Sequence, residues 1–239
     1  MERVSVVIPA AGEGKRFKGY SLRGVASKGA GENKLFLPLL KLPLLVRTLK
    51  TFANYSQTAE IILVSSSREI TNCKDLVKRY KIEKVKKIIP GGKSRQSSVF
   101  KGLKALAPET NLVVIHDGDR PLVTKEIIRR VIYQARKQGA ATAGVPVKDT
   151  IKVVEEKKVI KTLKRRKLWL IQTPQVFKSD LILKSHQRAK ENKFLATDDA
   201  MLVERIGHSV GMALGSYENI KITTQEDLLL AEAILIRRS

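Results

Sequence analysis

The stretch VSVVIPAAGEGKR, residues 4–16, decides which fold this sequence can adopt. Residues 4–9 are apolar on both faces and rich in β-branched side chains, which is typical of a short strand buried on both sides. A loop with Gly12, Gly14 and two basic residues follows directly. Phe17 occupies the third glycine position of a dinucleotide-binding fingerprint, so that motif is excluded. The small residues and cations instead indicate a loop that holds phosphate.

Downstream of this loop, short apolar runs alternate with helical patterns. Strands are predicted at residues 61–64, 85–89, 112–115 and 142–145, and helices at 43–52, 71–80, 97–106 and 124–139. This alternation predicts an α/β fold with a doubly wound, mostly parallel sheet and crossover helices on both faces. Ligands bind outside the carboxyl ends of such strands. We therefore expect four loops to gather at one edge: 10–34, 91–98, 116–121 and 146–150.

The pattern changes at residues 149–174. Two short strands, 151–155 and 159–163, flank an acidic-basic turn, and 169–172 reads as a third strand. This region predicts a projecting β-arm within a single domain that spans residues 1–239. Helices are predicted at 179–190 and 198–205, and a last helix after Thr223, which has capping-box spacing to Glu226.

Composition excludes several classes of protein. With 239 residues and 43% hydrophobic residues, intrinsic disorder is not expected. No apolar run approaches the ~20 residues that span a bilayer, and the apolar start is too short for a signal peptide. Cys73 is the only cysteine, so no disulfide framework is possible. These features predict a cytoplasmic protein without membrane segments.

The net charge of +23 favours either a polyanionic partner or anionic substrates, and it is also compatible with a lysine-rich surface that has no specific target. Seven basic residues and no acidic residue lie within 157–167. Aromatic residues make up only 5% of the chain, and no basic stretch alternates with aromatic rings. A nucleic-acid-binding protein is therefore the less favoured alternative.

Three further motifs bear on chemistry. Gly91-Gly92-Lys93-Ser94 imitates a phosphate loop, but Lys87 stands where its first glycine is required. The paired glycines still suit a backbone cradle at a helix start. Asp117 and Asp119 follow the fourth strand, where they could hold a divalent metal on a phosphate or cap a turn.

Lys221 is expected in the middle of an apolar strand, pointing to a ligand. Asp198 and Asp199 fit the first turn of a helix, where acidic side chains favour the helix dipole. No nucleophile elbow is present. Glycine loops and many cations together favour phosphoryl or nucleotidyl transfer, in which catalysis is mostly positioning and charge stabilisation.

Eight motifs in order resemble the 2-C-methyl-D-erythritol 4-phosphate cytidylyltransferase family: PAAGEGKR, NK at 33–34, PGGKSRQSSVFKGL, HDGDRP, VPVKDTIK, TPQVF, TDDA and ENIKITTQEDLLLAE. The resemblance runs from Val4 to Glu232. It implies a Rossmann-like nucleotidyltransferase fold, a homodimer locked by the β-arm, and Mg²⁺-dependent transfer from CTP to methylerythritol phosphate. The ribitol-5-phosphate cytidylyltransferase branch shares most of these motifs and is the alternative.

The resemblance also implies roles for single residues. Arg16 and Lys34 match the pair that stabilises the transition state at the α-phosphate. Arg165 and Lys221 match the pair that positions the phosphate nucleophile, with Arg165 and Thr150 acting across the dimer interface.

Nucleotide-binding positions are implied in three places. Gly92 and Ser98 match cytosine and ribose contacts, and Asp117 and Thr173 match substrate or metal-site positions, with Asp117 as the implied Mg²⁺ ligand. Arg120 is implied as a further substrate-binding residue. The triphosphate loop comprises Ala10, Ala11, Gly12 and Gly14.

The sequence departs from the family pattern near these positions. The loop between Arg16 and Lys34 is longer than usual, and Asn33 replaces the usual proline. Asp119 stands where the family has a small residue. This added carboxylate would perturb metal binding or face solvent. Arg166 is the alternative to Arg165 as the arginine of the arm.

Overall fold

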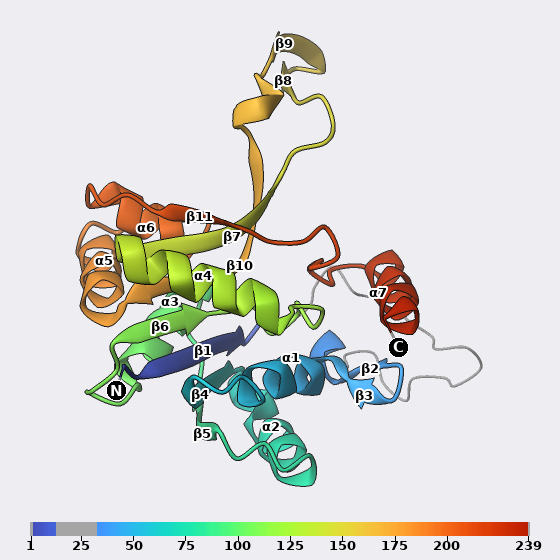
Figure 1. Ribbon diagram of the computed structural model, residues 1–239, viewed down its shortest axis with the longest axis vertical. Coiled ribbons are helices and arrows are strands. Elements are labelled where there is room, and N and C mark those ends of the chain that lie inside the picture. Colours follow the sequence, from blue (N-terminus) through green and yellow to red (C-terminus); the bar gives the residue numbers. More distant parts are fainter. Residues whose placement is uncertain (1, 13–32, 239) are drawn as a thin grey trace.

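A seven-stranded sheet forms the centre of the computed structural model, which describes residues 2–12 and 33–238 (Figure 1). The strand order is β11-β7-β10-β6-β1-β4-β5, and only β10 runs antiparallel to its neighbours. This arrangement confirms the predicted mostly parallel α/β sheet. The strands are β1 (Val4–Ala10), β4 (Thr58–Ser65), β5 (Val85–Pro90), β6 (Leu112–Ile115), β7 (Ala140–Pro146), β10 (Trp169–Lys178) and β11 (Gly211–Leu214).

Helices cover both faces of the sheet, as the apolar strands require (Figure 1). Val6 and Ile8 of β1 pack into one core, whereas Val7 between them packs into the other. The first core is shared with α1 (Leu44–Ala53), α2 (Ile70–Arg79), α4 (Lys125–Gln138) and α7 (Gln225–Arg237). The second is shared with α3 (Arg95–Lys104), α5 (Ser179–Glu191) and α6 (Asp199–Arg205). Short elements complete the fold: η2 (Lys34–Phe36), β2 (Pro38–Leu39), β3 (Leu42–Pro43), η3 (Ser67–Glu69) and η4 (Arg165–Lys167).

The predicted arm is present as a hairpin of β8 (Lys152–Glu155) and β9 (Lys158–Thr162) that projects from the body (Figure 1). The expectation that residues 169–172 form a third strand of the arm was wrong. They begin β10 and pair with β7, with Leu170 opposite Val145. The same strand continues along β6, so its full length belongs to the central sheet.

The ends of the helices agree with the sequence prediction at α4 and differ by one or two residues at α3 and α7. Thr124 caps α4 and Gly139 ends it with a φ of 81°, both as predicted. The helix predicted from residue 97 begins at Arg95, because Ser94 and Ser97 cap each other reciprocally. At α7 the capping pair is Thr224 with Asp227, one position beyond the predicted pair.

Two segments near the carboxyl end differ from the sequence prediction. Lys221 was expected inside a strand, but residues 219–224 form no strand. The segment is held by single contacts instead, such as the Ile222 backbone N–H that donates to the Asp119 carbonyl at 2.9 Å. The edge strand β11 was not predicted; its four residues alternate between buried and exposed, and none of them is β-branched.

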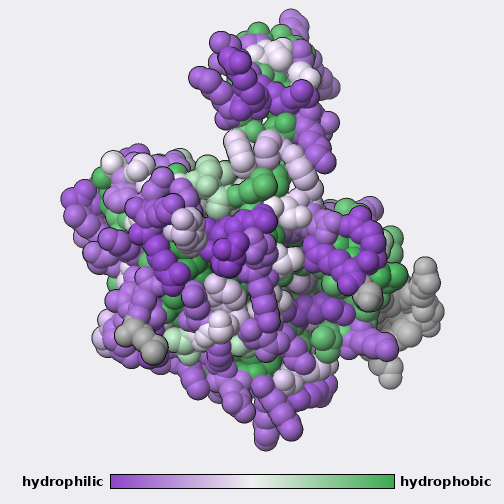
Figure 2. Space-filling model, in the orientation of Figure 1, coloured by the Kyte–Doolittle hydropathy of each residue, from purple (hydrophilic) through white to green (hydrophobic). Residues whose placement is uncertain are grey.

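The visible surface is mostly hydrophilic, in keeping with the high charge (Figure 2). Apolar residues gather where the arm joins the body (Figure 2), and Leu170 and Ile171 are 54% and 42% exposed there. Within the described residues, no helix has the length and apolar character needed to cross a membrane.

Candidate functional site

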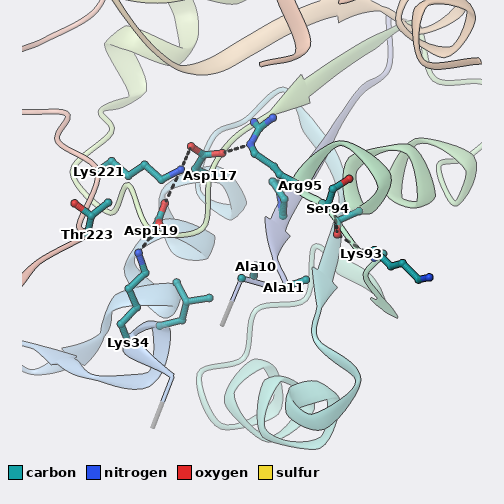
Figure 3. Close-up of a pocket in the computed structure, with 15 residues that line it drawn as sticks. Ala10, Ala11, Lys34, Lys93, Ser94, Arg95, Asp117, Asp119, Lys221 and Thr223 are labelled. Atoms are coloured by element: carbon teal, nitrogen blue, oxygen red, sulfur yellow. Dashed lines mark hydrogen bonds and ion pairs between the residues drawn. The ribbon is translucent and has the colours of Figure 1, made fainter. Parts of the chain in front are cut away.

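Three loops that follow strands enclose a cavity of 590 Å³ at one edge of the sheet (Figure 3). They follow β1, β5 and β6, and the segment around Lys221 closes the cavity. This confirms the expected gathering of loops, except that the loop after β7 leads into the arm and contributes no lining residue. The cavity is lined by Pro9, Ala10, Ala11, Gly12, Lys34, Leu35, Gly92, Lys93, Ser94, Arg95, Ser98, Asp117, Asp119, Lys221 and Thr223.

The glycine loops approach each other too closely for side chains. A Cβ on Gly91 would come within 2.5 Å of the Ala11 Cβ and 2.8 Å of the Ser98 Oγ. The Gly92 N–H donates to the Ser98 Oγ at 3.0 Å, and this hydroxyl donates to the Ser94 carbonyl at 2.8 Å. Ser98, implied as a ribose contact, therefore fixes the shape of the cavity wall in this structure.

Asp117 is the buried acid of the cavity, and three cations surround it. Its Oδ1 accepts from the Arg95 Nε at 2.9 Å, its Oδ2 accepts from the Lys221 Nζ at 2.9 Å, and the Arg120 Nε lies 3.8 Å from Oδ2. Burial alone would raise the pKa of Asp117, but Arg95, Lys221 and Arg120 hold it far below the ordinary range. The carboxylate is therefore charged at any physiological pH.

A second buried acid supports this cluster from behind. Arg95 donates through Nη1 to the Asp199 Oδ2 at 2.7 Å, and the His186 Nε2 lies 3.0 Å from the Asp199 Oδ1. Burial would raise the pKa of Asp199, but Arg95 and His186 lower it. Asp198 caps α6, whereas Asp199 lies in its first turn and binds Arg95. The helix dipole, which the sequence suggested for both acids, therefore does not account for the ion pair of Asp199 with Arg95. Sequence reasoning missed Asp199 and Arg95 as site residues.

Lys34 and Lys221 meet at Asp119, which lies between them (Figure 3). The Lys34 Nζ donates to the Asp119 Oδ2 at 2.6 Å and to the Ile222 carbonyl at 2.5 Å. The Lys221 Nζ lies 3.8 Å from the Asp119 Oδ1. Asp119 therefore pairs with two lysines, and of the two alternatives given for it, the one in which it faces solvent was wrong.

The cavity can accept a cation, although the protein supplies few ligands for one. Among residues 2–12 and 33–238, no three His, Cys, Asp or Glu side chains gather closely enough to hold a metal ion. The Lys221 ammonium lies between the Asp117 and Asp119 carboxylates, so a positive charge is accommodated there. One protein carboxylate plus substrate phosphates is a common Mg²⁺ environment, and Asp117 fits that pattern.

The remaining predicted residues lie in different places. Thr173 stands behind the cavity, where its Oγ1 accepts from the Asp117 N–H at 3.1 Å, and Arg120 donates to the Asn219 carbonyl at 2.8 Å. Thr150 and Arg165 are exposed at the arm and do not line the cavity; the Arg165 Nη1 donates to the Lys148 carbonyl. Gly14 and Arg16 lie outside the described residues.

Comparisons with known proteins find relatives that match this chain over nearly its whole length. The family model described as 2-C-methyl-D-erythritol 4-phosphate cytidylyltransferase matches residues 4–237. The protein of that name from Halalkalibacterium halodurans is 47% identical over 98% of this chain and 97% of its own.

Two of the solved structures that share the fold illustrate the similarity. One is 4-diphosphocytidyl-2C-methyl-D-erythritol synthase from Anaerococcus prevotii, with a TM-score of 0.82, 33% identity and 99% coverage of both chains. The other is the 2-C-methyl-D-erythritol 4-phosphate cytidylyltransferase from Thermus thermophilus, with a TM-score of 0.77, 30% identity and coverage of 98% of this chain and 99% of its own.

His116, directly before Asp117, makes the stability of this region sensitive to pH. Its ring is fully buried against Phe52, with ring centroids 4.8 Å apart, and its Nε2 donates to the Arg120 carbonyl at 3.0 Å. Burial lowers the pKa of His116 to about 4. The folded protein therefore excludes a proton that the unfolded chain binds below about pH 6.5.

We expect the free energy of unfolding to fall by about 3 kcal/mol from His116 alone as the pH drops from about 6.5 to 4. The contribution of neutral His116 to the free energy of unfolding is complete above the pKa of histidine in the unfolded chain, about 6.5. It is lost as the pH falls toward the pKa of His116 in the folded protein, about 4. Urea unfolding at several pH values measures the slope of the free energy of unfolding against pH. This slope should be smaller in His116→Gln than in the wild type. Equal slopes in wild type and variant would contradict the assignment.

Proposed function

The chain belongs to the 2-C-methyl-D-erythritol 4-phosphate cytidylyltransferase family, and from this premise we propose that it joins CTP to 2-C-methyl-D-erythritol 4-phosphate in the cavity around Asp117. The products are CDP-methylerythritol and pyrophosphate. One observation carries the assignment to this cavity. Lys34 and Lys221, from opposite ends of the chain, share a carboxylate at its wall.

The reaction is an in-line displacement at phosphorus. A phosphate oxygen of methylerythritol phosphate attacks the α-phosphorus of CTP and forms a new P–O bond. The bond to the bridging oxygen of the β-phosphate breaks, and pyrophosphate leaves with the electron pair. Negative charge accumulates on the α-phosphate oxygens, so cations fixed beside them lower the barrier.

Lys34 is suited to that task because its ammonium is held in place before substrate binds. Its side chain is only 10% exposed and is anchored at Asp119 and at the Ile222 carbonyl. Arg16 would supply a second cation from the same glycine loop, as the family pattern implies. Lys221 would position the attacking phosphate from the opposite side of Asp119.

The small residues of the two glycine loops would receive the nucleotide. Ala10, Ala11 and Gly12 line the cavity next to Lys34, where short side chains let a triphosphate approach the backbone. Gly92 and Ser98 form the wall contributed by the loop after β5 and the start of α3, at the place proposed for cytosine and ribose.

Mg²⁺ is the proposed cofactor. Asp117 would hold it together with the phosphates of CTP, whose negative charge would offset the cations that already surround this carboxylate. When bound, Mg²⁺ neutralises phosphate charge and stabilises the departing pyrophosphate.

We further propose a cytoplasmic homodimer that exchanges arms. Thr150 and Arg165 cannot serve the cavity of their own chain, because they lie on the projecting hairpin and its root. Large apolar side chains are exposed along the same region, as expected of a surface that a second copy covers. They include Val154, Val159, Ile160, Leu170 and Ile171. The single buried, free cysteine suits a cytoplasmic location.

Pyrophosphate release with CTP and Mg²⁺ tests the function directly. We expect turnover with methylerythritol 4-phosphate and none with ribitol 5-phosphate, since all three relatives described above are named for methylerythritol. Turnover with ribitol 5-phosphate alone would move the chain to that branch. No turnover with either, together with salt-dependent binding to nucleic acid, would favour the binding-protein alternative.

Replacement of Lys34 tests its role at the α-phosphate. Lys34→Ala should lower kcat by at least about a hundredfold, the scale for losing one group that stabilises transition-state charge. Lys74→Ala, at an exposed position of α2, is the matched control and should leave kcat unchanged. Unchanged turnover in Lys34→Ala would remove Lys34 from the site.

Mixed dimers test whether arms act across the interface. Arg165→Ala should raise the KM for methylerythritol phosphate, because a cation that positions its phosphate is lost. Co-expression of Arg165→Ala with Lys34→Ala chains should restore part of the activity, since one of the two cavities in a hybrid then has both residues intact. Verified hybrids without recovered activity would contradict the exchange of arms.

A further inference from the structure

Asp119 is the residue of the cavity wall for which the family pattern offers no role. It follows β6, and its side chain is 14% exposed. Figure 3 shows its carboxylate between the side chains of Lys34 and Lys221, with a dashed line to each. A largely buried carboxylate needs charged partners, and the two lysines provide them.

The contacts of Lys34 show what Asp119 does to it. An ammonium group has three N–H donors. Asp119 accepts one and the Ile222 carbonyl accepts another. The two residues are also joined through their backbones, because the Ile222 N–H donates to the Asp119 backbone carbonyl at 2.9 Å. The ammonium is thus fixed at two points on the cavity wall, and its third donor remains for a phosphate oxygen.

Asp119 also keeps two like charges close together. The Lys221 Nζ lies 2.9 Å from the Asp117 Oδ2 and 3.8 Å from the Asp119 Oδ1. Without the Asp119 carboxylate, the ammonium groups of Lys34 and Lys221 would repel each other across the cavity. Either side chain could then swing away along its flexible stem.

We propose that Asp119 is a positioning residue of the transfer reaction: it acts through Lys34, holding its ammonium where one N–H faces the reacting phosphate. The inference rests on the proposed function. It assigns to this chain a support for the catalytic lysine that a small residue at the same position cannot supply.

Two substitutions separate this role from a general effect of charge. In Asp119→Asn, the amide oxygen still accepts from the Lys34 Nζ, so kcat should fall by less than about fivefold. In Asp119→Ala, the anchor is lost and kcat should fall about 10- to 100-fold, the range for a small misplacement of a catalytic group. The KM for CTP should change less than about threefold in both, because each variant keeps every cation of the cavity.

A double substitution asks whether Asp119 acts through Lys34. Adding Asp119→Ala to Lys34→Ala should lower kcat no further than Lys34→Ala alone, within about twofold, because the group that Asp119 positions is already missing. Glu126→Ala is the matched control, since Glu126 also pairs with two cations, Arg129 and Arg130, but lies on α4 outside the cavity. Its kcat should equal that of the wild type. If Asp119→Ala fails to fold, Asp119→Ser takes its place, because a serine hydroxyl is too short to anchor Lys34.

The kcat values of the three variants decide whether Asp119 positions Lys34. A large loss in Asp119→Ala, a small loss in Asp119→Asn and no further loss in the double variant would support the inference. Wild-type kcat in Asp119→Ala, equal losses in both variants, or additive losses with Lys34→Ala would overturn it. So would a higher Mg²⁺ requirement in both variants, which would make Asp119 a metal ligand. A wild type without turnover would overturn the proposed function and this inference together.

Discussion

The buried charge of Asp117 is the constraint on which the site depends. A carboxylate removed from water needs compensation, and here it comes from Arg95, Arg120 and Lys221. These cations come from α3, from the loop after β6 and from the segment before α7. One acid thus holds together parts of the chain that share no strand pairing. Arg95 extends the cluster to Asp199, and so anchors α6 as well.

This cluster gives the cavity its chemical character. Cations and carboxylates alternate from Lys34 through Asp119, Lys221, Asp117 and Arg95 to Asp199. Each cation is thereby held without substrate, which is the preorganisation that charge-stabilised transfer requires. A triphosphate that enters would meet cations that are already in position, so the side chains would need little rearrangement.

The fold could be predicted largely from apolar patterning, because strands buried on both faces leave a clear signal. The residues of the glycine loops and Asp117 were also predictable, since they follow strand ends. Arg95 and Asp199 were not, because their importance lies in a contact between distant parts of the chain that no local spacing encodes. Lys221 lines the cavity, but its assignment to a strand was wrong, because side-chain and single backbone contacts replace the hydrogen bonds of a strand there. Thr150 and Arg165 lie at the arm, away from the cavity, and the roles proposed for them need a second copy of the chain.

The position of the arm between β7 and β10 governs how the length of this chain can vary. Residues 147–168 leave the sheet and return to it, so an inserted or deleted residue there alters the hairpin and leaves the body intact. Within β10 the tolerance disappears. Val176 packs into one core and Phe177 into the other, and a slip by a single residue would exchange their faces and place the phenyl ring where a smaller side chain fits. A change of length is therefore tolerated better in the arm than in β10, so the arm can diversify while β10 stays fixed.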